Sequence, residues 1–194
     1  MAKDSAKLHL GCGLSILPDW INVDCVDMPG VDLVFDLDKC DSHSLPIEDN
    51  CIDTFFASHL LEHIAKPLPL MQELYRVAKT DAQLTFFVPY GSSDDAFEDP
   101  THVRAYFLNS FYYFSQPYYW RANYGYSADW QPEQILLKIS AENHGGRMAE
   151  DIMEDIMTLR NIVIEMGVTL RAVKPARPAK RELQSFAELR FDFV

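Results

Sequence analysis

A short strand that runs directly into a glycine turn most constrains how this chain can fold. Residues 7–13 read KLHLGCG, in which residues 7–11 alternate polar and apolar side chains as a half-buried strand does. Further short runs rich in β-branched or aromatic residues follow, each bounded by Pro, Gly, Asp or Asn: residues 21–25, 31–36 and 51–57. Residues 67–79 carry apolar side chains at helical spacing, and residues 82–89 have the pattern of a buried strand. Strands alternating with helical or loop crossovers predict an α/β fold, with a parallel sheet covered on both faces.

The second half of the chain differs from the first in its residue composition and patterning. Residues 109–126 are densely aromatic, so the segment around 109–130 is the best candidate for a lid or insertion. Residues 148–166 place apolar side chains on one stripe and are followed by Gly167, which predicts a helix with a glycine stop. Ile135, Leu137 and Ile139 suggest a strand, and residues 189–193 alternate as a closing strand. With 194 residues, 48% of them apolar, we expect a single domain over residues 1–194.

Charge and hydropathy exclude several functional classes. Asp and Glu total 29 against 17 Lys and Arg, so the net charge of −12 opposes a general attraction to nucleic acid or to an anionic membrane. No apolar run approaches the roughly 20 residues of a spanning helix, and residues 1–7 are polar, without the hydrophobic region of a signal peptide. We therefore expect a cytoplasmic protein. Its four cysteines form no CxxC pair, and we expect them to be reduced: Cys12, Cys25, Cys40 and Cys51.

The glycine turn and a following acidic residue indicate a ligand that contains a nucleoside. Gly11 and Gly13 would let the main chain turn sharply and approach a ligand closely. Asp24, at the end of the second strand, could accept hydrogen bonds from ribose hydroxyls. The full GxGxxG pattern is absent, because Ile16 stands at the third glycine position, and Asp24 follows Gly11 by only 13 positions. A tight structural turn and a solvated acid at a strand end are the alternative interpretations.

In this arrangement the sequence resembles class I S-adenosylmethionine-dependent methyltransferases, in particular the small bacterial type 11-like proteins. The matching text is LHLGCG, WINVD, FDLDKCDSHSLPIEDNCIDTFFASHLLEHI, VPYG and DPTHVRAYF, over residues 7–114. The resemblance implies a Rossmann-like, mostly parallel seven-stranded sheet with helices on both faces, and S-adenosylmethionine as cofactor. It does not identify the methyl acceptor.

The resemblance also implies roles for individual residues. It places Gly11, Cys12 and Gly13 beside the methionine part of the cofactor, and Asp24 on the ribose. Asp36 and Leu37 would border the adenine, while Ser58 and His59 would lie next to the sulfonium and the transferable methyl. The sequence departs from the family at Ser15, which replaces a glycine, and at residues 80–82, where the family commonly has Pro-Gly-Gly.

A zinc peptidase is a competing interpretation of one motif. His59, Glu62 and His63 match HxxEH, in which two histidines bind the metal while the glutamate activates water. The pattern is short, follows a buried strand directly and lacks a third ligand. We therefore expect no metal, and a structural role for Glu62 and His63 at the start of the following helix.

Residues 99–104, DPTHVR, follow the fifth strand and would lie over the carboxyl ends of the strands. Asp99 or Thr101 could cap a helix there. His102 could instead be a general base, since an unperturbed imidazole titrates near neutral pH. We expect His59 or His102 to carry catalysis. Basic residues gather in residues 171–181, where a solvated loop and a phosphate site are both open interpretations.

The sequence thus predicts an S-adenosylmethionine-dependent methyltransferase that acts on a small-molecule or carbohydrate-like acceptor. The alternative is a non-catalytic domain of the same fold that binds a cofactor or a protein partner through its aromatic residues. Those residues could also form a homodimer face: Tyr112, Tyr113, Tyr118, Tyr119, Trp120, Tyr124 and Tyr126.

Overall fold

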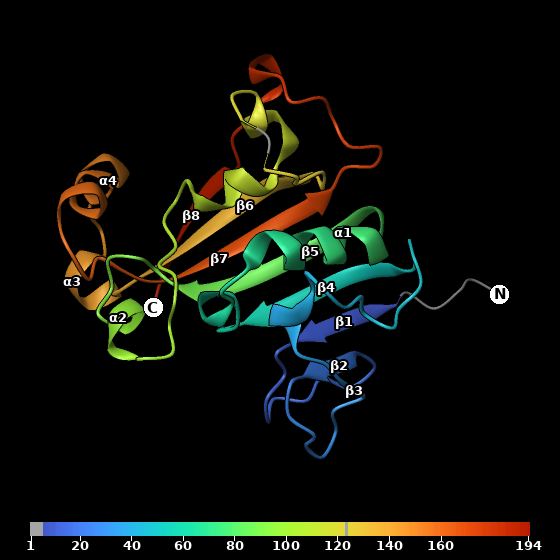
Figure 1. Ribbon diagram of the computed structural model, residues 1–194. Helices are drawn as coiled ribbons and strands as arrows, with labels where there is room; N and C mark the ends of the chain where they lie inside the picture. Colours follow the sequence, from blue (N-terminus) through green and yellow to red (C-terminus); the bar gives the residue numbers. More distant parts are fainter. Residues whose placement is uncertain (1–5, 123) are drawn as a thin grey trace.

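The computed structural model describes residues 6–122 and 124–194, so most of the amino-terminal segment 1–7 and one residue of the aromatic segment lie outside it. One sheet of eight strands runs through the described chain in the order β3-β2-β1-β4-β5-β7-β6-β8 (Figure 1). Strand β7 is antiparallel to β5 and β6, and every other neighbouring pair is parallel. The strands are β1 Lys7–Leu10, β2 Ile21–Asp24, β3 Leu33–Val34, β4 Ile52–Ser58, β5 Ala78–Pro89, β6 Trp130–Ile139, β7 Val163–Ala172 and β8 Glu188–Phe193. The expected α/β, Rossmann-like class is confirmed, with eight strands rather than seven because β8 extends the sheet beside β6.

Among the described residues, the helices are fewer than the strands. They are α1 Pro67–Val77, α2 Asp95–Glu98, α3 Ala141–His144 and α4 Ala149–Thr158, with 3₁₀ turns η1 Leu37–Lys39, η2 Leu61–His63, η3 Ser110–Phe114, η4 Gln116–Tyr119 and η5 Arg181–Leu183. Helix α1 begins at Pro67, where the missing N–H costs nothing because no first-turn N–H has a partner within the helix. Its buried residues Leu70, Met71, Leu74 and Val77 belong to the main core.

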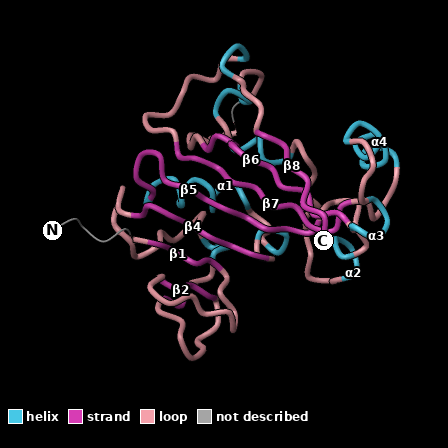
Figure 2. Tube along the Cα trace, turned by 180° about the vertical axis from the view of Figure 1, so that it is seen from behind, coloured by secondary structure: helices cyan, strands magenta, loops and turns pink. Residues whose placement is uncertain are grey.

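Helical cover lies mainly on one face of the sheet. Helix α1 crosses in front of β4 and β5 in Figure 1, whereas Figure 2, from behind, shows no described helix across β1, β4 and β5. The segments after β1 and β2, residues 11–20 and 25–32, hold ten and eight residues and contain Pro18 and Pro29. Crossovers between parallel strands usually need a dozen residues or more to include a helix. The expected cover on both faces is therefore incomplete in the described chain.

Aromatic residues fill much of the core on the α1 face. Trp130 is fully buried and donates its indole N–H to the carbonyl of Met71, 3.0 Å away. The inner side of the aromatic segment is core as well, because the buried ring of Phe111 lies 6.1 Å from that of Phe86 on β5. Tyr113 and Tyr124, in contrast, face solvent and are 61% and 75% exposed.

The helix predicted over residues 148–166 is wrong in its second half. Helix α4 ends at Thr158, Leu159 is extended, and the chain turns at Asn161, where φ is +59°. Val163 is the first residue of β7, so the apolar residues from this position onward belong to a strand and not to a helix. Gly167 is no helix stop: a Cβ there would lie 2.8 Å from Cε1 of Phe87, so glycine permits close packing between β7 and β5.

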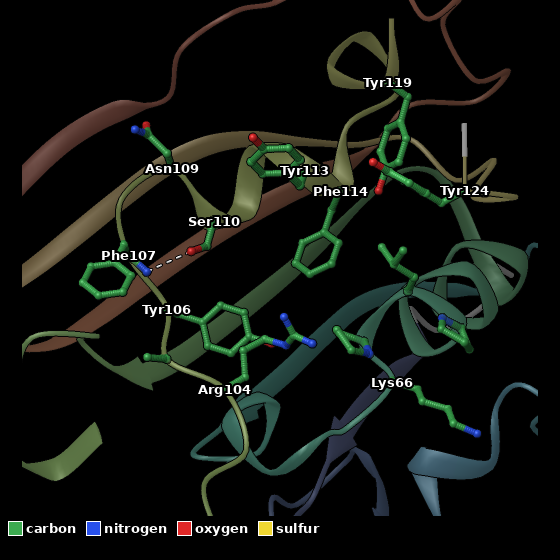
Figure 3. Close-up of a pocket in the computed structure, with 14 residues that line it drawn as sticks. Lys66, Arg104, Tyr106, Phe107, Asn109, Ser110, Tyr113, Phe114, Tyr119 and Tyr124 are labelled. Carbon is green, nitrogen blue, oxygen red and sulfur yellow. Dashed lines mark hydrogen bonds between the residues drawn. The ribbon is translucent and has the colours of Figure 1, made fainter. Parts of the chain in front are cut away.

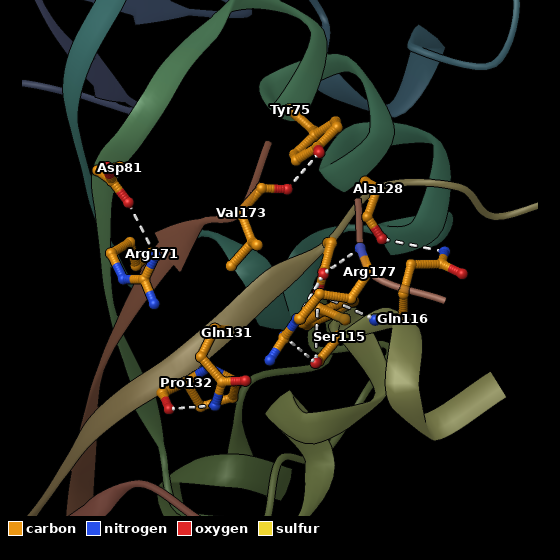
Figure 4. Close-up of polar contacts among 12 residues, drawn as sticks. Tyr75, Asp81, Ser115, Gln116, Ala128, Gln131, Pro132, Arg171, Val173 and Arg177 are labelled. Carbon is orange, nitrogen blue, oxygen red and sulfur yellow. Dashed lines mark hydrogen bonds and ion pairs between the residues drawn. The ribbon is translucent and has the colours of Figure 1, made fainter. Parts of the chain in front are cut away.

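The basic stretch 171–181 is engaged by the protein itself (Figure 4). Arg171 pairs with Asp81 and Glu133, and the Lys174 ammonium donates to the carbonyls of Arg76 and Ala78. Arg177 donates from its backbone N–H and from its guanidinium to the carboxylate of Asp129, at 2.8–3.0 Å. Because Arg171, Lys174 and Arg177 already have protein partners, these three cations do not form a free phosphate site.

The carboxylate of Asp129 is fully buried and forms an ion pair with Arg177. Besides Arg177, it accepts hydrogen bonds from the Ser115 hydroxyl and the Gln116 backbone N–H, at 3.3 and 3.1 Å. The ion pair therefore fastens the carboxyl-terminal stretch to the aromatic segment and to the entry of β6.

Replacing Arg177 with Met should lower the free energy of unfolding by roughly 3 kcal/mol, because it leaves a buried charge without its counter-ion. Urea denaturation followed by circular dichroism measures this loss. The control is Arg190→Met, which removes a pair between two side chains that are each more than half exposed and should leave the transition midpoint unchanged. Equal midpoints for the two variants would contradict the structural role of the Arg177 pair.

No helix among the described residues is long and apolar enough to cross a lipid bilayer. All four cysteines are free. Burial and the nearby acids Glu73 and Asp36 raise the pKa of Cys40 to about 12, which keeps this thiol protonated at neutral pH.

Candidate active site

The glycine turn after β1 adopts a conformation that side chains oppose. Gly11 and Gly13 have φ of +61° and +50°, in the left-handed region. A Cβ on Gly11 would lie 2.7 Å from Cδ1 of Leu60, so glycine is required for packing as well. Around a Cβ on Gly13, no described atom lies within 4 Å, so the turn faces open space at that position.

Asp24 ties this turn to the end of β2. Its Oδ2 accepts a hydrogen bond from the Gly13 N–H at 2.8 Å, and its Oδ1 accepts one from the Val26 N–H at 3.0 Å. The backbone N–H of Cys12 continues the ladder to the carbonyl of Val23. An ionised carboxylate offers about four acceptor positions, so Asp24 keeps capacity for a further donor beside these two N–H groups and the neighbouring Cys25 thiol.

The next expected site residues follow β3. Asp36 caps η1 by accepting from the Asp38 N–H at 3.1 Å, and its other oxygen lies 3.2 Å from the Lys39 ammonium. Leu37 is buried, with 5% of its surface exposed. The Phe35 N–H donates to the carbonyl of Asp24, so this turn is held directly to the end of β2. The structure thus brings the expected residues after β1, β2 and β3 to one edge of the sheet.

His59 follows Ser58 at the end of β4 in a strained conformation. Its φ of +51° is rare for a residue with a side chain and is held by the N–H bond to the carbonyl of Phe87. Nδ1 lies 3.4 Å from Oε1 of Glu62, and Nε2 lies 2.8 Å from Oε1 of Glu165. Contact with Glu62, opposed by partial burial and reinforced by Glu165, raises the pKa of His59 to about 9. The side chain is therefore an imidazolium at neutral pH.

His102, the other expected catalytic histidine, lies near the same carboxylate. Its Nε2 is 4.0 Å from Oε1 of Glu62 and 3.9 Å from Oδ2 of Asp99, and only 8% of its side chain is exposed. The Val103 N–H donates to the carbonyl of Glu62 at 2.8 Å, which holds the 99–104 segment against η2. Glu62 thus connects the two histidines, a position the sequence interpretation gave only a structural role.

Glu165 is the site residue that the sequence interpretation missed. It lies near the start of β7, and because β7 is antiparallel to β5, that start meets the carboxyl end of β5 at Pro89. Its second carboxylate oxygen pairs with Lys138 on β6. Only the inserted antiparallel strand brings this residue to the site, and residues 163–167 carried no signal for it.

A pocket of about 600 Å³ opens beside the 99–104 segment (Figure 3). The start of α1 forms one wall, with Lys66, and the aromatic segment forms the other, with Tyr113, Tyr119 and Tyr124. Arg104, two residues after His102, lines it as well. The Lys66 ammonium pairs with Asp41, so Arg104 is the lining cation that an aromatic pocket of this kind could turn toward an anionic group of a bound molecule.

Comparisons with known proteins agree with this geometry. Residues 8–86 match the model of a family described as a methyltransferase domain. The structure resembles YcgJ from Bacillus subtilis, with a TM-score of 0.54 and 15% identity, over 89% of this chain and 93% of the other. It also resembles a SAM-dependent methyltransferase from Archaeoglobus fulgidus, with a TM-score of 0.52 and 17% identity, over 87% of each chain. Among curated protein sequences, none matches this chain significantly.

The comparisons thus show a match to a methyltransferase domain over residues 8–86, which is less than half of the chain, and a fold shared with a known methyltransferase over most of it. A third structure of the same fold, the [4+2]-cyclase SpnF, has a TM-score of 0.52 and 15% identity, over 87% of this chain and 75% of that one. Since one fold hosts different reactions, the acceptor chemistry has to be argued from the site.

Gly13→Ala tests whether the open space at the turn is ligand space. The methyl group meets no described atom, so we expect only the backbone cost of the left-handed conformation, about 1 kcal/mol in the free energy of unfolding. S-adenosylhomocysteine, measured by isothermal titration calorimetry, should bind at least about tenfold more weakly. Gly146→Ala is the matched control, with φ of +77° and equally open surroundings far along the chain, and should leave binding unchanged. Equal affinities in the two variants would show that no ligand occupies the turn.

His59 should titrate with a midpoint near 9 in NMR spectra of protein freed of metal ions by EDTA. Because the folded pKa is raised above the ordinary 6.5, the stabilisation is fully present below 6.5 and is lost as the pH rises through about 9. Glu165→Gln should lower the midpoint, and the remote, exposed Glu188→Gln should not. A midpoint near 6.5 in the wild type would mean that the carboxylate contacts do not persist in solution.

Proposed function

We propose that the protein is an S-adenosylmethionine-dependent methyltransferase that acts on a small-molecule or carbohydrate-like acceptor. The observation that carries this proposal is the hydrogen bond between the Gly13 N–H and Asp24, beside a turn with open space. This bond holds the glycine turn and the Asp24 carboxylate next to each other at one edge of the sheet. A ligand with an amino-acid part and a ribose would need both, the turn beside the amino-acid part and the carboxylate beside the ribose.

The residues at this edge fit the cofactor. Gly11, Cys12 and Gly13 would border its methionine part, and the free acceptor position of Asp24 would take a ribose hydroxyl. Asp36 and Leu37, at the third strand, would border the adenine ring, with the buried Leu37 side chain offering an apolar surface. Ser58 and His59, at the end of β4, would face the sulfonium side.

S-adenosylmethionine supplies an activated methyl group, and this chain's residues position it. Methyl transfer is a displacement, so its rate depends on holding the donor carbon and the acceptor atom in line and close together. The strained backbone at His59 is fixed to β5 by its N–H, which gives the residue beside the sulfonium a set orientation. A general base is needed only when the nucleophile is a hydroxyl or a protonated amine, whereas a carboxylate acceptor would need none.

The acceptor would lie between the His59–Glu62–His102 cluster and the aromatic pocket. His59 turns its two ring nitrogens toward Glu62 and Glu165, so it would shape the acceptor side of the site through a fixed position. His102 is the better candidate for a general base, because its Nε2 lies 4.0 Å from the Glu62 carboxylate, which would stabilise the imidazolium that forms. Arg104, at the wall of the pocket, would receive an anionic group of the acceptor.

Isothermal titration with S-adenosylhomocysteine tests the cofactor site. Asp24→Ala should weaken binding at least about tenfold, since a charge-assisted hydrogen bond to the ribose is lost. The matched control is Asp27→Ala, an exposed acid three residues away, which should bind as the wild type does. Absence of binding by the folded wild-type protein would overturn the proposal.

A further inference from the structure

The carboxylate of Glu62 is buried without a hydrogen bond. Its side chain is 2% exposed, and neither oxygen has a hydrogen-bond partner among the described residues. Burying an ionised carboxylate in this way costs several kcal/mol unless a counter-charge lies nearby. The nearest cationic group, Nδ1 of His59, lies 3.4 Å away and belongs to a ring whose other nitrogen is already bound to Glu165.

Two further histidines converge on this carboxylate. Glu62, His63 and His102 each offer one ligand atom, and these atoms lie within 4.8 Å of one another. The two imidazole rings meet edge to face, with centroids 4.7 Å apart. Nδ1 of His102 is also buried without a hydrogen-bond partner. Three metal-binding side chains with unfilled bonding capacity therefore face one small volume.

The tautomer of His63 is set by its neighbours. The Thr101 hydroxyl donates its single hydrogen to Oδ1 of Asp99 at 2.6 Å, so it can only accept from Nδ1 of His63, 3.0 Å away. A neutral His63 with its proton on Nδ1 presents the lone pair of Nε2. A carboxylate and a hydroxyl that orient a histidine in this way are typical of the surroundings of metal ligands.

We propose that Glu62, His63 and His102 bind a divalent first-row transition metal ion, with Zn²⁺ the best match. Two imidazole nitrogens and one carboxylate oxygen form a ligand set that leaves a fourth position open in catalytic zinc sites. Ligand atoms around a tetrahedral Zn²⁺ lie about 3.3 Å apart, so atoms that now lie within 4.8 Å of one another must close by at most about 1.5 Å. The ion would also add a positive charge beside the buried Glu62, whose neighbour His59 is shared with Glu165.

This ligand set differs from the one that the HxxEH pattern implies. In that pattern the two histidines would be the ligands and the glutamate would activate water. Here His59 turns to Glu165, while Glu62 itself is a ligand and His102 arrives from the loop after α2. The loop and η2 are joined by the bond from the Val103 N–H to the Glu62 carbonyl, so the chain holds the ligands near one another before an ion binds.

The open position of the ion would favour an acceptor that presents an oxygen, from a hydroxyl or a carboxylate. This part of the inference rests on the proposed function, because it places the acceptor beside His59, whereas metal binding does not depend on it. With an ion in place, His102 would act as its ligand and not as a free base.

Zinc titration of EDTA-treated protein by calorimetry tests the site. We expect one Zn²⁺ per chain, binding at least about 100-fold more weakly in His102→Ala than in the wild type. The control is His43→Ala, an exposed histidine outside the cluster, which should bind as the wild type does. Co²⁺ in place of Zn²⁺ should give the visible absorption of a tetrahedral site with nitrogen ligands, and His102→Ala should abolish it.

Glu62→Gln provides a second variant, which keeps the size of the buried side chain and so avoids the cavity that a substitution by alanine would leave. It keeps the shape of the side chain and removes the carboxylate, so the metal-free protein should keep its folded circular dichroism spectrum while Zn²⁺ binding is lost. Failure of the wild type to bind stoichiometric Zn²⁺, or equal binding by His102→Ala and His43→Ala, would overturn the metal site. Titration of S-adenosylhomocysteine on the same samples separates the two proposals. If the protein binds S-adenosylhomocysteine but not Zn²⁺, only the metal site is overturned. If it binds Zn²⁺ but not S-adenosylhomocysteine, only the methyltransferase proposal is overturned.

Discussion

Parallel pairing of β1 with β2 and β4 brings three strand ends to one edge of the sheet, and the chemistry assigned to this protein depends on that edge. Side chains that follow parallel strands meet there whatever their separation in sequence. The turn at Gly11 to Gly13, Asp24 and His59 come together for this reason. The connections after β1 and β2 are too short for full helices, so turns and hydrogen bonds, not helix packing, define the shape of this edge.

Three carboxylates show how differently the protein treats a buried or partly buried charge. Asp129 is fully buried and saturated by Arg177, a hydroxyl and two backbone N–H groups, so it serves the fold. Asp24 has one backbone donor on each oxygen and capacity for more. Glu62 is buried with no hydrogen bond at all. Binding to an outside partner is expected where the protein leaves bonding capacity unused, which orders these residues from structural to functional.

Much of the fold could be predicted from local sequence patterns. The strands β1, β2, β4, β6 and β8 and the helix α1 follow from alternation and helical spacing, because each keeps one face in the core. The helix expected over residues 148–166 failed where Val163 and Gly167 fit a strand as well as a helix, and only pairing with β5 decides between the two. The connections after β1 and β2 hold only ten and eight residues, and these lengths already indicate that no full helix fits there.

Site residues that lie at the ends of predicted strands could be predicted from the sequence, whereas those that reach the site through the order of strands in the sheet could not. Asp24 and His59 end predicted strands, and their positions could be anticipated from that fact alone. Glu165 could not, because it reaches the site only through the antiparallel insertion of β7 between β5 and β6. Glu62 was visible in the HLLEH text, but its lack of a hydrogen bond is a property of three-dimensional packing and has no signature in the sequence.

The central claim is that the turn after β1 and the carboxylate after β2 together hold an adenosyl amino acid. NMR of ¹⁵N-labelled protein titrated with S-adenosylhomocysteine tests it most directly. The account predicts that the backbone amide signals of Gly13, Val26 and Asp38 shift together and saturate with one ligand per chain. Shifts confined to the aromatic pocket around Tyr113 and Tyr119, with the Gly13 amide unmoved, would contradict it.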